Sequence, residues 1–403
     1  MIDNTILNTK ETSVDLADII REGIADFTAK YGKMPAKHWK VINHITTCRT
    51  EEMGSHIYKC DNCGHKVIHH NSCRDRQCPK CQAVARADWV EKRIAEILPV
   101  GYFHIVFTVP EELNKFGLRN KKVFYNILFC SVSETLLELG KDPKWLGGNI
   151  GFTATLHTWG QAVLEHPHIH CVVPGGGIRL DDKKWVCFRE KYIFPDDVLA
   201  NLFRGKFIAY FKKAVECKEI SLCGPLQCYQ DRITFQKSIK ALWSKKWVVY
   251  AKVPFGNAAQ VIKYIGRYTH RIALSNNRIL SHKEGKVTFS WKDYADGNRK
   301  KIMALNTIEF IRRFLLHILP EGFVRIRYYG FLSNSTKKSN LKKCFELLKK
   351  KYEKKHYNKS SIADRMKEIF GIDITVCPKC KKGHCLYYGE ILKKPHRELL
   401  LAA

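Results

Sequence analysis

Acidic residues are scarce in this chain of 403 residues. Aspartate and glutamate together number 39 against 69 lysines and arginines, which gives a formal net charge of +30. This imbalance excludes a surface of evenly mixed charge. It favours a polyanionic partner, because neutralised phosphates release their counterions. We therefore expect the chain to bind nucleic acid.

Long apolar runs are missing as well. No uninterrupted stretch approaches the ~20 apolar residues that a membrane-spanning helix needs. The opening segment MIDNTILNTKETSVDLADII is polar and lacks the apolar core of a signal peptide. The sequence contains no internal repeat. We expect a cytoplasmic, DNA-associated protein with no membrane partner.

Cysteine, in contrast, is plentiful. The chain has 16 cysteines, and their C-x-x-C pairs favour metal binding over disulfides in a chain of cytosolic character. Cys60-x-x-Cys63 and Cys78-x-x-Cys81 are separated by 14 residues, which is close to the spacing of a zinc ribbon. Four thiolates leave no open coordination position. These four cysteines therefore predict a structural Zn²⁺ rather than a catalytic one.

Further potential ligands surround these pairs. Three of them could complete a second zinc site, or else be free thiols and a surface imidazole: Cys48, His56 and Cys73. Near the C-terminus, Cys377 and Cys380 form another C-x-x-C pair, with His384 and Cys385 close behind. This late cluster is either a third metal site or part of a basic tail that contacts DNA.

Hydrophobic periodicity predicts helices and strands that do not strictly alternate. The expected helices cover residues 12–45, 83–98, 119–140, 194–217, 258–270 and 306–319. The expected strands cover residues 101–110, 151–160, 168–177, 247–253, 286–294 and 323–332. This mixture favours an α+β fold over a doubly wound sheet.

The run His166-Pro167-His168-Ile169-His170 carries the first chemical signal. Side chains alternate between the two faces of a strand, so His168 and His170 point the same way and can hold one divalent metal ion. The third ligand should come from the preceding strand or the loop after it, with Gln161 slightly favoured over His157. An amide oxygen tunes a site toward Mg²⁺ or Mn²⁺. Glu165 is a further candidate.

The second chemical signal is the run KYIGRYTHR, where Tyr264 and Tyr268 lie four residues apart. On a helix this spacing puts both hydroxyls on one face. The alternative is plain aromatic packing, but the flanking basic residues make that unusual, and we expect them to bind DNA: Lys263, Arg267, His270 and Arg271. A metal to polarise a phosphate and a tyrosine to attack it suggest phosphodiester chemistry.

Several sequence blocks resemble those of a known family, in the same order. They are NSCRDRQCPKCQ (71–82), FHIVFTVPEELN (103–114), LHTWGQ (156–161), HPHIHCVVPGGG (166–177), YIGRYTHRIALSN (264–276) and FVRIRYYGFLSN (323–334). A His-hydrophobic-His motif followed by a tyrosine-bearing helix is similar to the HUH superfamily of replication initiators, relaxases and transposases. The blocks more specifically resemble the two-tyrosine transposases of the insertion-sequence-91 family.

This resemblance implies a central antiparallel sheet of the HUH endonuclease type with helices, preceded by a zinc-binding module. It also implies a metal-dependent endonuclease and strand transferase that works by rolling-circle transposition. Such an enzyme nicks and rejoins single-stranded DNA at element ends and target through 5′-phosphotyrosine intermediates. The metal pair maps onto His168 and His170, and the nucleophiles map onto Tyr264 and Tyr268. Gln77 stands where the family pattern CRxRHCPKC has a histidine, which weakens a second zinc site if that histidine is a ligand in relatives.

We expect three consecutive domains: a helical start with the zinc module at 1–98, a catalytic domain at 99–335 and a basic C-terminal region with a cysteine cluster at 336–403. Two other functions fit the same motifs. A plasmid replication initiator or relaxase would use the same chemistry. A non-catalytic zinc-finger DNA-binding protein would use only the metal module.

Overall fold

The computed structural model describes residues 14–94, 96–188, 193–252, 266, 274–293, 296–352, 361, 363–364, 366–367, 371 and 373–393. They form two compact units, each assembled from separate stretches of chain. The first takes its described residues from within 1–89, 270–318 and 358–403, and the second from within 90–269 and 319–357. Each unit is described by itself.

A five-stranded antiparallel sheet forms the centre of the second unit, which confirms the expected α+β class. Its strand order is β13-β5-β6-β3-β9, and every neighbouring pair is antiparallel. The strands in chain order are β3 (Tyr102–Thr108), β5 (Gly151–Trp159), β6 (Glu165–Pro174), β9 (Val248–Lys252) and β13 (Ile326–Gly330).

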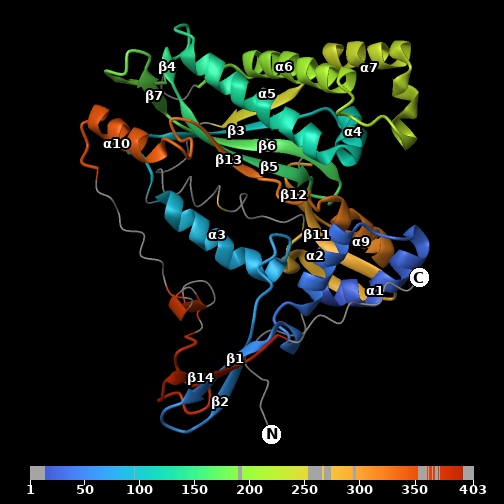
Figure 1. The fold of residues 1–403 in the computed structure, drawn as a ribbon, viewed down its shortest axis with the longest axis vertical. Coiled ribbons are helices and arrows are strands. Elements are labelled where there is room, and N and C mark those ends of the chain that lie inside the picture. Colours follow the sequence, from blue (N-terminus) through green and yellow to red (C-terminus); the bar gives the residue numbers. More distant parts are fainter. Residues whose placement is uncertain are drawn as a thin grey trace. The chain divides into compact units, whose positions relative to one another are not determined.

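One face of this sheet is apolar and covered by helices (Figure 1). The covering helices are α5 (Lys121–Lys141) and α6 (Asp196–Glu216). The strands contribute alternate residues to this core, such as Phe107 of β3 and Ile169 of β6. Phe107 packs edge-on against Phe203 of α6, with ring centroids 5.2 Å apart. Period-two alternation therefore leaves the intervening residues of the same strands on the opposite face.

Helix α5 is long and apolar enough to cross a membrane by length and composition alone. However, 67% of its most apolar segment is buried inside the structure. Its buried side chains, Phe124 among them, pack in the hydrophobic core against the sheet. This is the packing expected of a core helix.

Smaller elements complete the second unit. A three-stranded sheet has the order β4-β7-β8, formed by β4 (Gly148–Asn149), β7 (Gly176–Arg179) and β8 (Trp185–Cys187). The other helices described in this unit are η2 (Glu111–Leu113), α4 (Asn114–Arg119), η3 (Gly224–Gln230), α7 (Arg232–Ser244) and α10 (Lys337–Leu347). The unit boundary falls inside α3 (Pro79–Ile94).

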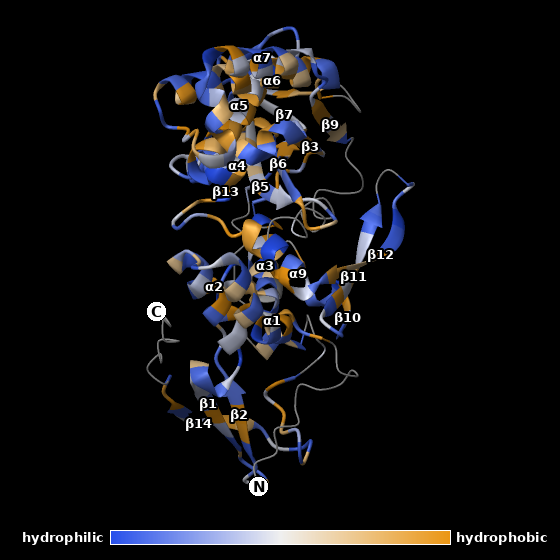
Figure 2. Ribbon diagram, turned by 90° about the vertical axis from the view of Figure 1, so that its right-hand side faces the viewer, coloured by the Kyte–Doolittle hydropathy of each residue, from blue (hydrophilic) through white to orange (hydrophobic). Residues whose placement is uncertain are grey.

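The first unit holds a group of helices and a second antiparallel sheet. The helices are α1 (Leu16–Tyr31), α2 (Ala36–Thr47) and α9 (Thr307–Leu316), with the short turns η1 (Glu51–Met53) and η4 (Asn276–Arg278). The sheet order is β10-β11-β12, from β10 (Ile279–Lys283), β11 (Lys286–Asp293) and β12 (Arg299–Asn306). The outer end of the β11–β12 ribbon is hydrophilic (blue in Figure 2), where Lys292 pairs with Lys300.

Helices α1 and α9 approach each other closely at Gly23. A Cβ atom at this position would lie 2.5 Å from Cγ2 of Thr307, so only glycine fits without a shift. Both helices begin at a side-chain cap. Asp15 accepts a hydrogen bond from the Ala17 amide, and Asn306 caps α9. The expected single helix over 12–45 is thus two helices, because Gly32 and Pro35 interrupt it.

The other sheet of the first unit joins an N-terminal hairpin to a strand of the C-terminal region. Its order is β14-β1-β2, from β1 (Ser55–Cys60), β2 (Lys66–His70) and β14 (Cys385–Ile391). Strand β14 pairs antiparallel with β1, with Cys60 opposite Cys385. This arrangement differs from the expected separate region at 336–403, because residues 373–393 join the first unit whereas α10 belongs to the second. The expected helix at 258–270 lies outside the described residues apart from Gly266.

Candidate metal centres and active site

Three histidines meet on one face of the central sheet of the second unit. His157 of β5 lies directly opposite His168 of β6 in the strand register. One ring nitrogen from each of His157, His168 and His170 lies within 4.8 Å of the others. His157 and His170 are buried, and His168 is partly exposed. The two-residue spacing correctly predicted that His168 and His170 share a face.

Trp159 packs against His157. A register shift separates His157 from Trp159, and their rings stack with centroids 4.7 Å apart. Trp159 is itself buried. Its contact with His157 indicates a packing role for this tryptophan at the edge of the histidine group.

His104 is the residue that sequence reasoning missed. It lies on β3, where a 2.8 Å hydrogen bond joins its Nε2 to Nδ1 of His170. Such a bond fixes the tautomer of a histidine and directs its other ring nitrogen toward a metal. Burial, with a smaller contribution from Lys252, lowers the pKa of His104 to about 4, so the ring is neutral near pH 7. The available signal was its place in the expected strand 101–110, where His104 alternates with the apolar Phe103 and Ile105.

Glu165 points away from the histidine group, so its interpretation as a third ligand is wrong. It sits an odd number of residues from His168 and His170, and alternation places it on the helix-covered face. There its carboxylate accepts a 2.9 Å hydrogen bond from the Tyr125 hydroxyl. Burial raises the pKa of Glu165 to about 7.

Gln161 lies in the turn between β5 and β6. This turn is closed by a hydrogen bond from the Gly160 amide to the Leu164 carbonyl. The structure brings His157, the less favoured of the two candidates, into the histidine group. Ligation by Gln161 stays a prediction. The predicted nucleophiles and DNA-binding residues lie outside the described residues: Tyr264, Tyr268, Lys263, Arg267, His270 and Arg271.

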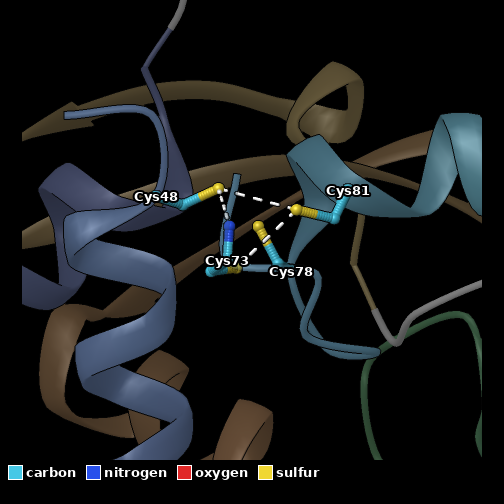
Figure 3. A group of neighbouring side chains, drawn as sticks. All are labelled: Cys48, Cys73, Cys78 and Cys81. Carbon is cyan, nitrogen blue, oxygen red and sulfur yellow. Dashed lines mark hydrogen bonds between the residues drawn. The ribbon is translucent and has the colours of Figure 1, made fainter. Parts of the chain in front are cut away.

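A first cysteine group lies in the first unit, at the end of α2 and the start of α3 (Figure 3). Its members are Cys48, Cys73, Cys78 and Cys81. The sulfur of Cys81 lies 3.6 Å from that of Cys48 and 3.7 Å from that of Cys73. Hydrogen bonds within the group lower the pKa of Cys48 and Cys81 and raise the pKa of Cys73 and Cys78, so the four thiols share their protons.

A second cysteine group contains Cys60, Cys63, Cys377 and Cys380. The predicted pairing of Cys60 and Cys63 with Cys78 and Cys81 is therefore wrong. The physical reason is the β1–β2 hairpin. Its base is closed by the bond from the Asn71 amide to the Gly54 carbonyl, whereas Cys60 lies at its far end. Six strand residues span ~20 Å, too far for both pairs to share one ion.

The predicted second site of Cys48, His56 and Cys73 is only partly right. Cys48 and Cys73 do join a group, but together with Cys78 and Cys81. His56 lies on β1 beside the ring of Tyr387 and is not a member. Gln77 is buried, and its side-chain amide donates to the His317 carbonyl at 3.4 Å. Four thiolates complete a tetrahedral set, so this group needs no histidine at position 77.

Comparison with known proteins agrees with this geometry. A family described as "Putative transposase" matches residues 151–340, which include the three histidines. A family described as "Transposase zinc-binding domain" matches residues 19–109, which include the complete first cysteine group. No solved structure matches the chain.

Two named relatives extend over most of the chain. The chain is 43% identical over 374 residues to "Putative transposase y4qJ" of Sinorhizobium fredii (strain NBRC 101917 / NGR234), covering 92% of this chain and 94% of the relative. It is 24% identical over 313 residues to "Transposase for insertion sequence element IS801" of Pseudomonas savastanoi pv. phaseolicola, covering 77% of this chain and 74% of that protein. With both family matches, this shows that the chain belongs to the IS91 family of transposases.

Proposed function

We propose that this transposase nicks and rejoins single-stranded DNA at the ends of its insertion sequence, with Tyr264 and Tyr268 as nucleophiles. The observation that carries the proposal is the convergence of His157, His168 and His170, whose ring nitrogens lie within 4.8 Å of one another. This arrangement fits a divalent metal ion. The substrate would place the protein on DNA in the cytoplasm.

The three histidines would hold a Mg²⁺ or Mn²⁺ ion, and Mn²⁺ is the better match to an all-imidazole set. When bound, such an ion polarises the scissile phosphate and offsets the charge that develops on it. His104 would orient His170 through their 2.8 Å hydrogen bond. The chain's own residues thus prepare one polar face of the sheet for a phosphodiester.

The reaction itself would be a phosphoryl transfer to tyrosine. A Tyr264 or Tyr268 oxygen forms a bond to phosphorus and the bond from phosphorus to the 3′ oxygen breaks. The phenolic oxygen loses its proton, and the departing 3′ oxygen takes up one. The products are a 5′-phosphotyrosine and a free 3′ hydroxyl, so the bond energy is kept for rejoining. Two tyrosines allow two successive transfers. The basic residues Lys263, Arg267, His270 and Arg271 would bind the phosphates.

Metal-dependent nicking tests the role of the histidine group. We expect His168→Ala combined with His170→Ala to abolish nicking of single-stranded oligonucleotides from the element ends, while binding to them persists. The matched control is His38→Ala on α2, which lies in the first unit and should nick normally. Unchanged, metal-stimulated nicking by the double variant would disprove the assignment.

A further inference from the structure

The second cysteine group contains residues that neither matched family accounts for. Cys377 and Cys380 lie beyond both matched ranges, 19–109 and 151–340. Their partners Cys60 and Cys63 lie at the tip of the β1–β2 hairpin. We propose that these four cysteines hold a second structural Zn²⁺, and that this ion makes the C-terminal segment 373–393 an integral part of the zinc-binding domain.

The sulfur positions match tetrahedral zinc. Zn–S bonds of about 2.3 Å in a tetrahedron require sulfurs ~3.8 Å apart. The Cys60 and Cys380 sulfurs are 3.7 Å apart, and so are those of Cys63 and Cys377. Each of these close contacts joins one N-terminal cysteine to one C-terminal cysteine, so neither half of the chain supplies a complete site.

In each segment a backbone amide three residues further along the chain donates to a cysteine sulfur, as in zinc knuckles. The Cys63 amide donates to the Cys60 sulfur at 3.5 Å, and the Gly383 amide donates to the Cys380 sulfur at 3.3 Å. Gly383 passes so near that a Cβ atom there would lie 2.5 Å from the Cys60 sulfur. The absence of a side chain lets the C-terminal turn reach the hairpin tip.

Backbone and side-chain bonds fix the two segments next to the sulfurs. The Asp61 carboxylate accepts a 2.8 Å hydrogen bond from the His384 amide, and the Asp61 amide donates to the His384 carbonyl at 3.1 Å. A Zn²⁺ ion with four thiolates carries a net charge of −2. The adjoining lysines offset this charge: Lys59, Lys379, Lys381 and Lys382.

Apolar burial is too small to hold β14 in place without the metal. Leu386, Tyr387 and Tyr388 are 58%, 60% and 57% exposed, so the strand contributes little to a hydrophobic core. A small sheet with so little buried surface is marginal in water and needs another source of stability. Metal ligation can supply it, because the free energy of binding to a site absent from the unfolded chain adds to that of folding.

The two cysteine groups should differ in how readily they lose metal. Each group has two buried cysteines, Cys48 and Cys78 in the first and Cys60 and Cys377 in the second. The other two cysteines of the first group are only partly exposed, whereas Cys63 of the second group is exposed. A chelator or thiol reagent therefore reaches the second group first, and zinc should leave in two steps.

Zinc content by elemental analysis tests the proposal, measured in full-length protein carrying His168→Ala and His170→Ala so that the histidine group adds no metal. We expect two zinc ions per chain. Adding Cys377→Ser and Cys380→Ser should leave one. Adding Cys217→Ser and Cys223→Ser, which alter two exposed cysteines of the second unit, should leave two. One zinc in the parent protein, or two in the Cys377/Cys380 variant, would overturn the proposal.

Native-state alkylation followed by peptide mass spectrometry gives a test that needs no variant. With zinc bound, Cys63 should react far more slowly than Cys217, which is also exposed. After brief chelation, Cys60, Cys63, Cys377 and Cys380 should react together, before Cys48 and Cys78. Equal rates for Cys63 and Cys217 before chelation would contradict the site. Neither test depends on DNA cleavage, so the outcome is independent of the proposed function.

Discussion

At the scale of single residues, the histidine group depends on His104, a neighbour that binds no metal itself in our proposal. His104 lies one strand away from the group and contacts His170 through a 2.8 Å hydrogen bond. Its lowered pKa of about 4 keeps it neutral, so it adds no positive charge next to a cation. A neutral partner that fixes the tautomer of a ligand strengthens binding without competing for the ion.

His104→Ala should therefore weaken Mn²⁺ binding by roughly 10- to 100-fold, the usual effect of losing an outer partner of a metal ligand. His104→Gln keeps an oxygen that can accept a hydrogen bond, and should restore part of the affinity. Calorimetric titration of the full-length protein measures both. His38→Ala serves as the control. An affinity for Mn²⁺ unchanged by His104→Ala would show that His170 is positioned without it.

Glu165 makes the stability of the second unit depend on pH. Burial raises its pKa from 4.5 to about 7, so the folded state binds more protons than the unfolded state between these values. Stability must then fall as pH rises through this window. Glu165→Gln should remove this pH-dependent loss of stability. At pH 8 the variant should be more stable than the wild type by an amount on the order of 1–3 kcal/mol.

Thermal unfolding at pH 5 and pH 8 measures the effect of Glu165→Gln. The exposed Glu346 of α10 provides the control Glu346→Gln, which should show the wild-type pH dependence. An identical pH dependence in wild type and Glu165→Gln would mean that Glu165 ionises normally in the folded protein.

At the scale of elements, two helix glycines have opposite roles. A Cβ atom at Gly23 of α1 would lie 2.5 Å from Thr307 Cγ2, so the α1–α9 contact requires glycine. A Cβ atom at Gly205 of α6 would meet nothing nearer than Trp243 at 3.7 Å, an ordinary contact. Helix propensity alone would favour alanine at both positions by up to ~1 kcal/mol.

Gly23→Ala should lower stability by about 1–3 kcal/mol, because the clash outweighs the gain in propensity. Gly205→Ala should raise it by up to about 1 kcal/mol. Urea unfolding midpoints of the two variants and the wild type provide the comparison. A stabilised Gly23→Ala protein would mean that α1 and α9 separate easily.

At the scale of the whole molecule, the features that could be predicted from the sequence are those set by residue spacing over a short stretch of chain. The alternation of His168 and His170, the α+β class and most strands of the central sheet follow from spacing over a few residues. The cysteine grouping did not, because Cys60 and Cys63 find their partners more than 310 residues away in sequence, through the pairing of β1 with β14. His104 was missed for the same reason, since its neighbour His170 belongs to another strand.

Covalent trapping on DNA tests the central claim most directly. Purified protein is incubated with Mn²⁺ and single-stranded oligonucleotides from the flanks of its gene, labelled at the 3′ end because a 5′-phosphotyrosine retains the 3′ part of the strand. The products are separated on a denaturing protein gel. We expect a labelled band at the mass of the protein plus the retained oligonucleotide. The band should persist in Tyr31→Phe, a change in α1 of the first unit, and vanish when Tyr264→Phe and Tyr268→Phe are combined. An adduct that survives this double variant, or no adduct with any flank despite intact binding, would contradict a tyrosine-linked transposition mechanism.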